Sequence, residues 1–229
     1  MAAADNNQDK ERSVLASLRS MVPPRRLQFT EALRIAEWQA SRLLALSDID
    51  HEPVPGELVS SLPRIRIQYR DLPTSGLSFW DGKMWVVCLN RSEPTTRCRF
   101  TLFHELKHII DHGRTGLLYA GSQRHSADEQ AEQAADYFAG CALVPRQFLK
   151  RAWGRQVQRP MVLARLFDVS PRAISVRLDQ VGLTDPIPRC FSPETAPVKP
   201  APGRYYRQFT ADQQLGAARI MSMKEAGYA

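Results

Sequence analysis

Two histidines four residues apart, with a glutamate directly after the first, most strongly constrain how this chain can fold. His104, Glu105 and His108 lie in a stretch of helical spacing that ends before Gly113. Residues four apart lie on one face of a helix, so both imidazoles can reach one ion. Glu105, about a quarter-turn further round, can approach a water molecule on that ion. The sequence therefore predicts a metal-binding helix over about 95–111, capped by Gly113.

A third ligand is needed, because a catalytic zinc site takes three protein ligands and keeps one position for water. The extended pattern HExxHxxGxxH fails, since Asp111 stands at the glycine position and Arg114 at the distal histidine. Glu132, on a second predicted helix, has Asp136 four residues later on the same face. Asp136 can accept the second ring N–H of His104 and fix its tautomer. This pattern indicates Glu132 as the third ligand.

Other nearby residues are weaker candidates for the metal. Glu129 lies one turn before the preferred glutamate but has no acid four residues later. His112 is displaced by about 80° from His104 around the helix axis, and suits a place near the helix C-terminus, where a positive ring favours the dipole. His125 lies in a polar loop and is interpreted as a surface residue. The candidates for stabilising an oxyanion are Tyr119, Tyr137 and His125.

The remaining pattern is mainly helical, with a group of short strands before the motif. The predicted helices are residues 11–22, 30–46 (with Thr30 as N-cap), 95–111, 127–143, 147–153, 161–167 and 171–181. The predicted strands are residues 64–69, 76–80 and 84–89, with Asp81-Gly82 as a hairpin signal. We expect the α+β class, with the strands forming a small antiparallel sheet.

Changes in composition divide the chain into four parts. Residues 1–27 are an N-terminal extension with a short helix, and residues 28–184 are the main domain. Residues 185–206 contain six prolines and are expected to be a linker, which a C-terminal helix within residues 207–229 follows.

Charge and cysteine usage limit the surroundings of the protein. The net charge is +7, and basic residues outnumber acidic ones nine to three between 146 and 189. Such a block suits nucleic acid or an acidic partner, or is a solvated surface. No apolar run reaches membrane-spanning length, and the N-terminus lacks the features of a secretory signal. The four cysteines have no metal-pair spacing. We therefore expect a cytoplasmic protein.

Residues 163–183 are typical of a helix-turn-helix, with Ser170 as a cap and Pro171 at the first position of the second helix. Arg172, Ser175 and Arg177 are expected to face outward. The segment either contacts DNA, or completes the fold and grips a protein partner. Apolar residues occupy much of the second helix, which favours the second interpretation.

Several segments together carry a family resemblance. They are Gly76-Leu77-Ser78, Asn90 after the apolar strand, residues 99–108, residues 132–139 with Leu143-Val144-Pro145, and residues 163–170 with Arg177-Leu178. In this combination, from about residue 30 to 183, the chain resembles the ImmA/IrrE family of metallopeptidases. Lys107 stands where many members have glycine, and Asp136 where many have asparagine.

The resemblance implies a mainly helical metallopeptidase domain with helix-turn-helix-like helices at its C-terminal end. It also implies a cytoplasmic, site-specific endopeptidase that cleaves a helix-turn-helix repressor and so activates a mobile element or a stress response. The family's metal ligands correspond to His104, His108 and Glu132, and its catalytic glutamate to Glu105. Zn²⁺ is expected, although Mn²⁺ or Fe²⁺ also suits such ligands. The alternative is a regulator that binds DNA or protein and has a structural or vestigial metal site.

Overall fold

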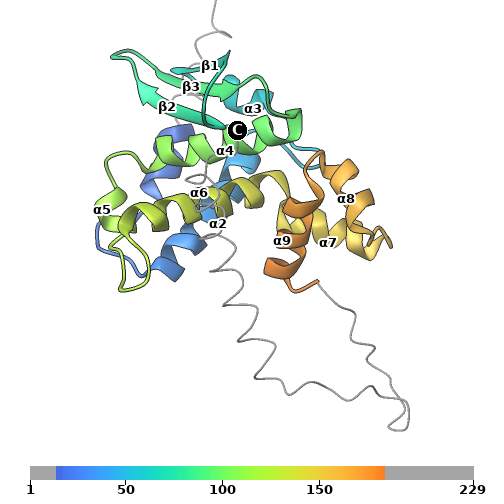
Figure 1. The fold of residues 1–229 in the computed structure, drawn as a ribbon. Helices are drawn as coiled ribbons and strands as arrows, with labels where there is room; N and C mark the ends of the chain where they lie inside the picture. The colour runs from blue at the N-terminus through green and yellow to red at the C-terminus, as the bar shows by residue number, and fades with distance from the viewer. Residues whose placement is uncertain (1–13, 184–229) are drawn as a thin grey trace, which may run out of the picture. The chain divides into compact units, whose positions relative to one another are not determined.

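The computed structural model describes residues 14–183 (Figure 1). The predicted linker, residues 185–206, and the predicted C-terminal helix, residues 207–229, lie outside the described residues, as do residues 1–13. The described part is mostly helical with one small sheet, which confirms the α+β class. Among the described residues, no helix has both the length and the apolar character needed to cross a membrane.

The long helices begin and end close to the predicted residues. The longer helices are α2 (Phe29–Leu46), α4 (Thr95–Asp111), α6 (Ala127–Leu143), α7 (Arg146–Gly154), α8 (Pro160–Phe167) and α9 (Pro171–Val181), and the single turns α3 (Glu57–Ser60) and α5 (Thr115–Leu118) were not predicted. The N-cap of α2 is Gln28, so the prediction of Thr30 was wrong by two residues. The Glu31 carboxylate accepts a hydrogen bond from the Gln28 amide at 3.0 Å and so fixes the earlier start.

The sheet is mixed, which corrects the predicted antiparallel arrangement. Its strands are β1 (Ile65–Arg70), β2 (Gly76–Trp80) and β3 (Trp85–Asn90), in the spatial order β1-β3-β2. The β2–β3 hairpin is antiparallel, but β3 pairs in parallel with β1. The chain leaves β1 for the far edge of the sheet, and β3 then returns between the two earlier strands. Since β3 is central, its residues 86–89 are all buried.

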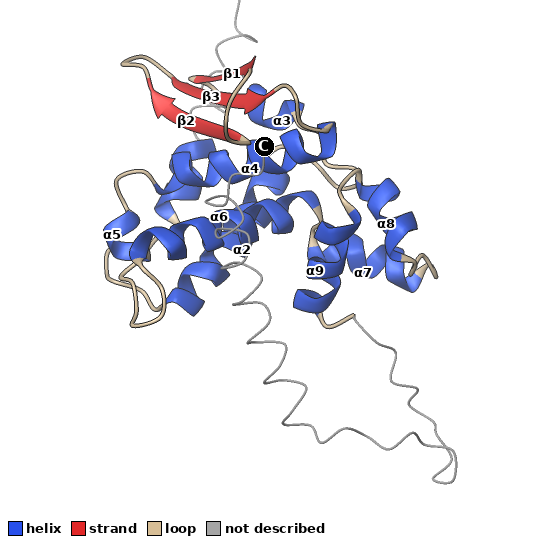
Figure 2. Ribbon diagram, viewed as in Figure 1, coloured by secondary structure: helices blue, strands red, loops and turns tan. Residues whose placement is uncertain are grey.

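The layers place α4 between the sheet and the other long helices (Figure 2). Strands β2 and β3 contact one side of α4, α6 packs against another side, and α2 packs against α6. Ala134 and Ala135 are fully buried in α6, which lets the helices approach closely. The sheet and α6 therefore fix the position of α4, the helix with the histidine motif, from two sides.

Helical residues 14–20, which belong to the predicted N-terminal extension, pack into the same core. Val14 and Leu18 are buried there. The Arg19 guanidinium donates hydrogen bonds to the carbonyl oxygens of Ile109 (2.7 Å) and Ile110 (3.3 Å) near the end of α4. These carbonyls lack partners within the helix, so Arg19 caps the C-terminal end of α4.

The C-terminal helices follow the predicted helix-turn-helix pattern, with one correction. Ser170 caps α9 as predicted, and Arg172 and Ser175 are exposed. Arg177, however, is only 1% exposed, so the prediction that it faces outward was wrong. It donates to the Val144 carbonyl oxygen at 3.2 Å, in space left by Gly140, where a Cβ would lie 3.3 Å from its Cδ. Arg177 therefore joins α9 to α6.

Candidate metal centre

Helices α4 and α6 bring three metal-ligating side chains together. The Nε2 atoms of His104 and His108 are 3.1 Å apart, and the Glu132 carboxylate oxygens lie 3.3 Å from the first and 3.4 Å from the second. A tetrahedral ion with bonds of about 2.0–2.1 Å separates its ligand atoms by about 3.3 Å. Two imidazole nitrogens and a carboxylate at these separations fit one zinc-sized ion.

A carboxylate fixes the orientation of the first histidine. Asp136 Oδ1 lies 2.8 Å from His104 Nδ1 and accepts its N–H. With one proton held on Nδ1, the ring can offer Nε2 as a ligand once a metal displaces the proton on that nitrogen. The structure thus places Asp136 where its spacing from Glu132 on α6 predicts.

The charges around His104 favour a cation. Burial opposes a positive charge on the ring, but hydrogen bonds to Asp136 and Glu132 outweigh it and raise the pKa of His104 to about 9. Hydrogen bonds from His104 and His108 lower the pKa of Glu132 well below its ordinary value. The Asp136 and Glu132 carboxylates therefore create a negative electrostatic potential at the site. A bound metal ion can balance this negative charge.

Glu129, the rival to Glu132, has another task. Its carboxylate accepts a hydrogen bond from the Ser126 amide at 2.8 Å, and Ser126 Oγ accepts from the Glu129 amide at 3.1 Å. This reciprocal pair caps the start of α6. The same carboxylate lies 3.8 Å from His125, so both residues belong to the cap region.

The other candidates of the sequence analysis have contacts of their own. The His112 ring packs edge-on against Trp85 at 4.9 Å, beyond the last residue of α4. Tyr119 is 3% exposed and donates to Asp111 Oδ2 at 2.5 Å. Tyr137 donates to a Glu37 carboxylate oxygen at 3.1 Å. Both tyrosine hydroxyls are thus engaged by carboxylates that are not among the candidate ligands.

Glu105 directly follows His104 in α4 and is 8% exposed. Its Oε2 accepts a hydrogen bond from Ser78 Oγ on β2 at 2.7 Å. Sequence reasoning singled out Ser78 only within a motif and assigned it no contact. The two-residue period of a strand could have indicated this contact, because it places Gly76 and Ser78 on the same face of β2.

A buried polar network occupies another face of α4. Lys107 is fully buried, and its Nζ donates to Asp111 Oδ1 (2.6 Å) and Gln39 Oε1 (2.9 Å). The Gln39 side chain donates in turn to the Leu18 carbonyl oxygen at 2.9 Å. Sequence reasoning missed this network, which ties α4 to α2 and to helical residues 14–20.

An open cavity of about 730 Å³ lies between α3, the sheet and the first half of α4. The α4 residues that line it are Thr95, Cys98, Arg99 and Leu102. Thr95 and His104 are nine residues apart, which puts them on opposite sides of the helix. The cavity is therefore separate from the candidate metal centre.

Exchange of the third ligand should remove the metal. In Glu132→Ala the site keeps only two imidazoles, so we expect the bound metal to fall from about one equivalent to less than a tenth after dialysis. Elemental analysis of the purified protein measures this. Glu129→Ala is the matched control on the same helix and should keep its metal. Loss of metal in the control alone would assign the ligand to Glu129.

Comparisons with known proteins identify the family and a similar fold. The family model described as the peptidase IrrE N-terminal-like domain matches residues 63–179, which are 117 of the 229 residues. A solved structure named as a Mycobacterium tuberculosis transcriptional regulator is similar in fold, with a TM-score of 0.54 and 18% identity. The match covers 78% of this chain but 54% of that protein, so this chain spans about half of its length. None of the curated proteins matches the sequence.

Proposed function

Because the chain belongs to the peptidase family with the IrrE N-terminal-like domain, we propose that it is a zinc-dependent endopeptidase. The metal is held by His104, His108 and Glu132. The observation that carries this proposal is the convergence of their three ligand atoms within 4.8 Å of one another. Manganese or iron suits the same donors and remains an outcome of the metal analysis.

The side chains divide the work of peptide hydrolysis. The bound zinc ion supplies Lewis acidity, which activates water and polarises the scissile carbonyl. Glu105 acts as the general base, taking a proton from the attacking water and passing it to the leaving amine. Asp136 keeps His104 in its ligating tautomer by holding the proton on Nδ1. Burial of Glu105 limits the directions that its carboxylate can take.

The proposed substrate is a helix-turn-helix transcriptional repressor, cut at one site in the cytoplasm. Support comes from the resemblance to the ImmA/IrrE family, and from the fold shared with a protein named as a transcriptional regulator. Cleavage would relieve repression of a mobile element or of a stress response.

Incubation of the purified chain with the repressor encoded beside its gene tests this function. We expect one cut, which a chelator abolishes and added Zn²⁺ restores. Mass spectrometry of the two fragments locates the cut. An intact repressor after incubation with metal-loaded protein would contradict the proposal.

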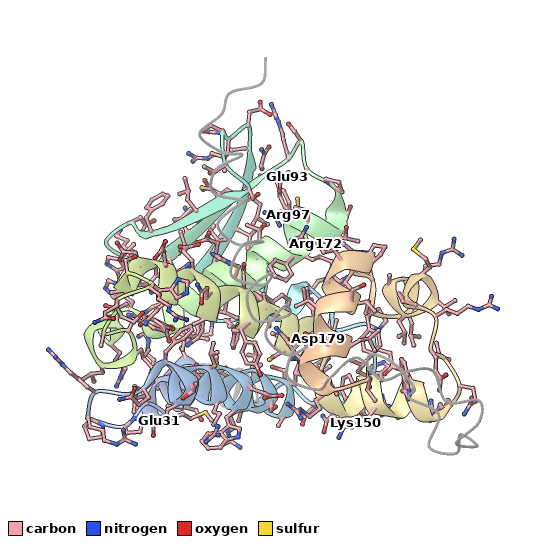
Figure 3. The ribbon with its side chains drawn as sticks, turned by 60° about the horizontal axis from the view of Figure 1, so that its bottom comes forward. Glu31, Glu93, Arg97, Lys150, Arg172 and Asp179 are labelled. Carbon is pink, nitrogen blue, oxygen red and sulfur yellow. The ribbon has the colours of Figure 1, made fainter. Side chains whose placement is uncertain are left out.

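A second candidate is a regulator that binds DNA. The exposed arginines of α8 and α9, Arg165 and Arg172, favour it. Figure 3 labels Arg172. Burial of Arg177 removes one of the expected contacts. DNA binding through these helices would weaken steeply as salt is raised, and would not depend on Glu105. A gel-shift titration against salt separates the two functions.

A further inference from the structure

A serine on the strand beside the metal centre holds the carboxylate of the general base. We propose that Ser78 is a positioning residue, which fixes Glu105 through the 2.7 Å hydrogen bond from Ser78 Oγ to Glu105 Oε2. This inference rests on the proposed function, since it concerns the same reaction. The contact leaves Oε1 as the oxygen that Ser78 does not engage, available to take the proton from water.

The strand follows the helix over this region. Gly76 of β2 faces Thr101 of α4, and Ser78 faces Glu105, one helical turn further along. Side chains two residues apart on a strand share a face and are about 7 Å apart, close to the 5.4 Å pitch of a helix. The short Ser78 side chain therefore reaches Glu105, which lies between His104 and His108 in α4.

Gly76 allows the close approach on which this contact depends. A Cβ at this position would lie 2.5 Å from Thr101 Cγ2 and 2.9 Å from the Cys88 carbonyl oxygen. No side chain fits there without a shift of the strand away from α4. A serine two residues later can touch the helix only because the strand lies so near.

The start of β2 is also anchored to the first turn of α4. Ser75 Oγ donates to Glu93 Oε1 at 2.8 Å, and Arg97 Nη2 donates to Ser75 Oγ at 3.1 Å. Figure 3 shows Glu93 and Arg97 close to one another at this end of α4. The position of Ser78 along the helix is thus set by the contacts of Ser75 and by the close packing of Gly76.

A hydroxyl donor orients a carboxylate without blocking its second oxygen. Glu105 is only 8% exposed, so water has little access to its carboxylate. Loss of Ser78 would leave Glu105 in place but free to rotate about its terminal bond, which lowers the fraction of molecules with a correctly directed Oε1. Turnover would fall, whereas substrate binding and metal content would not change.

Steady-state kinetics of three variants measure this role. Ser78→Ala removes the hydroxyl, and Ser78→Cys keeps the volume but provides only a weak donor; in both, kcat should fall about tenfold or more. KM and bound metal should equal those of the wild type. Ser78→Thr keeps the donor and suits a strand, so it should recover most of the lost kcat. Ser175→Ala, an exposed serine on α9, is the control and should have wild-type turnover.

Denaturant unfolding of the metal-free protein tests the contact without activity. If Ser78 and Glu105 interact, the shift of the urea midpoint in the Ser78→Ala/Glu105→Ala double variant differs from the sum of the two single shifts. Additive shifts, or wild-type kcat in Ser78→Ala, would overturn the proposal. A wild-type chain that cuts nothing would instead refute the proposed function, and with it the catalytic role of Ser78, while the midpoints would still report the contact.

Discussion

Glu105→Gln is expected to lower the rate of repressor cleavage by about 10²- to 10⁴-fold, the range typical for loss of a general base. The amide has almost the same shape as the carboxylate but cannot take a proton from water. Its oxygen can still accept the hydrogen bond from Ser78, so the local packing is preserved. A gel-based time course with the purified repressor measures the change in rate.

Metal content separates a lost base from a damaged site. Elemental analysis should find as much metal in Glu105→Gln as in the wild type, because Glu105 is not one of the three ligands. Glu57→Gln, at an exposed position on α3, is the control and should cut at the wild-type rate. If Glu105→Gln cleaved the repressor at the wild-type rate, or relieved repression as the wild type does, the result would contradict the peptidase function. It would favour a protein that acts by binding.

Lys107→Met is expected to lower the free energy of unfolding by about 3–5 kcal/mol, the cost of breaking a buried ion pair by removal of one partner. The methionine fills much of the lysine volume, but Asp111 is then left buried next to Gln39 without the ammonium group. Urea unfolding of the metal-free protein measures the loss. Because the network joins α4 to α2, the loss should appear in the global transition.

The exposed Lys150 of α7 provides the matched control (Figure 3). Lys150→Met should change the free energy of unfolding by less than about 0.5 kcal/mol, as surface substitutions usually do. Similar losses in the two variants would show that the Lys107–Asp111 pair carries no special weight. The pair would then be no more stabilising than an exposed one.

The helix that carries the motif could be predicted to the residue, because its amphipathic spacing and the glycine at 113 both report on local structure. The convergence of Glu132 with the two histidines could be predicted as well, since Glu132 and Asp136 lie on one face of their own helix. Each of these inferences depends on residues within a few turns of one another. Local spacing is what the sequence displays most directly.

Contacts between distant segments were harder to predict. The parallel pairing of β1 with β3 depends on the path between strands, although the unbroken apolar run in β3 does indicate a strand covered on both faces. Lys107 and Asp111 are spaced as an ordinary surface ion pair, and only packing against Gln39 buries them. Arg177 likewise has the spacing of an exposed residue, and the room for it comes from Gly140 on another helix.

Arg19 caps the end of α4 from a position 44 residues before the start of the family match at residue 63. Helix α2, which packs along α6, also precedes that start. All the residues of the candidate metal centre, and Glu105, thus lie inside the segment that matches the family, but part of their support lies outside it. The segment that matches the family would therefore not be expected to work by itself. Gene fusion or recombination that preserved activity would have to include helical residues 14–20 and α2 together with the motif.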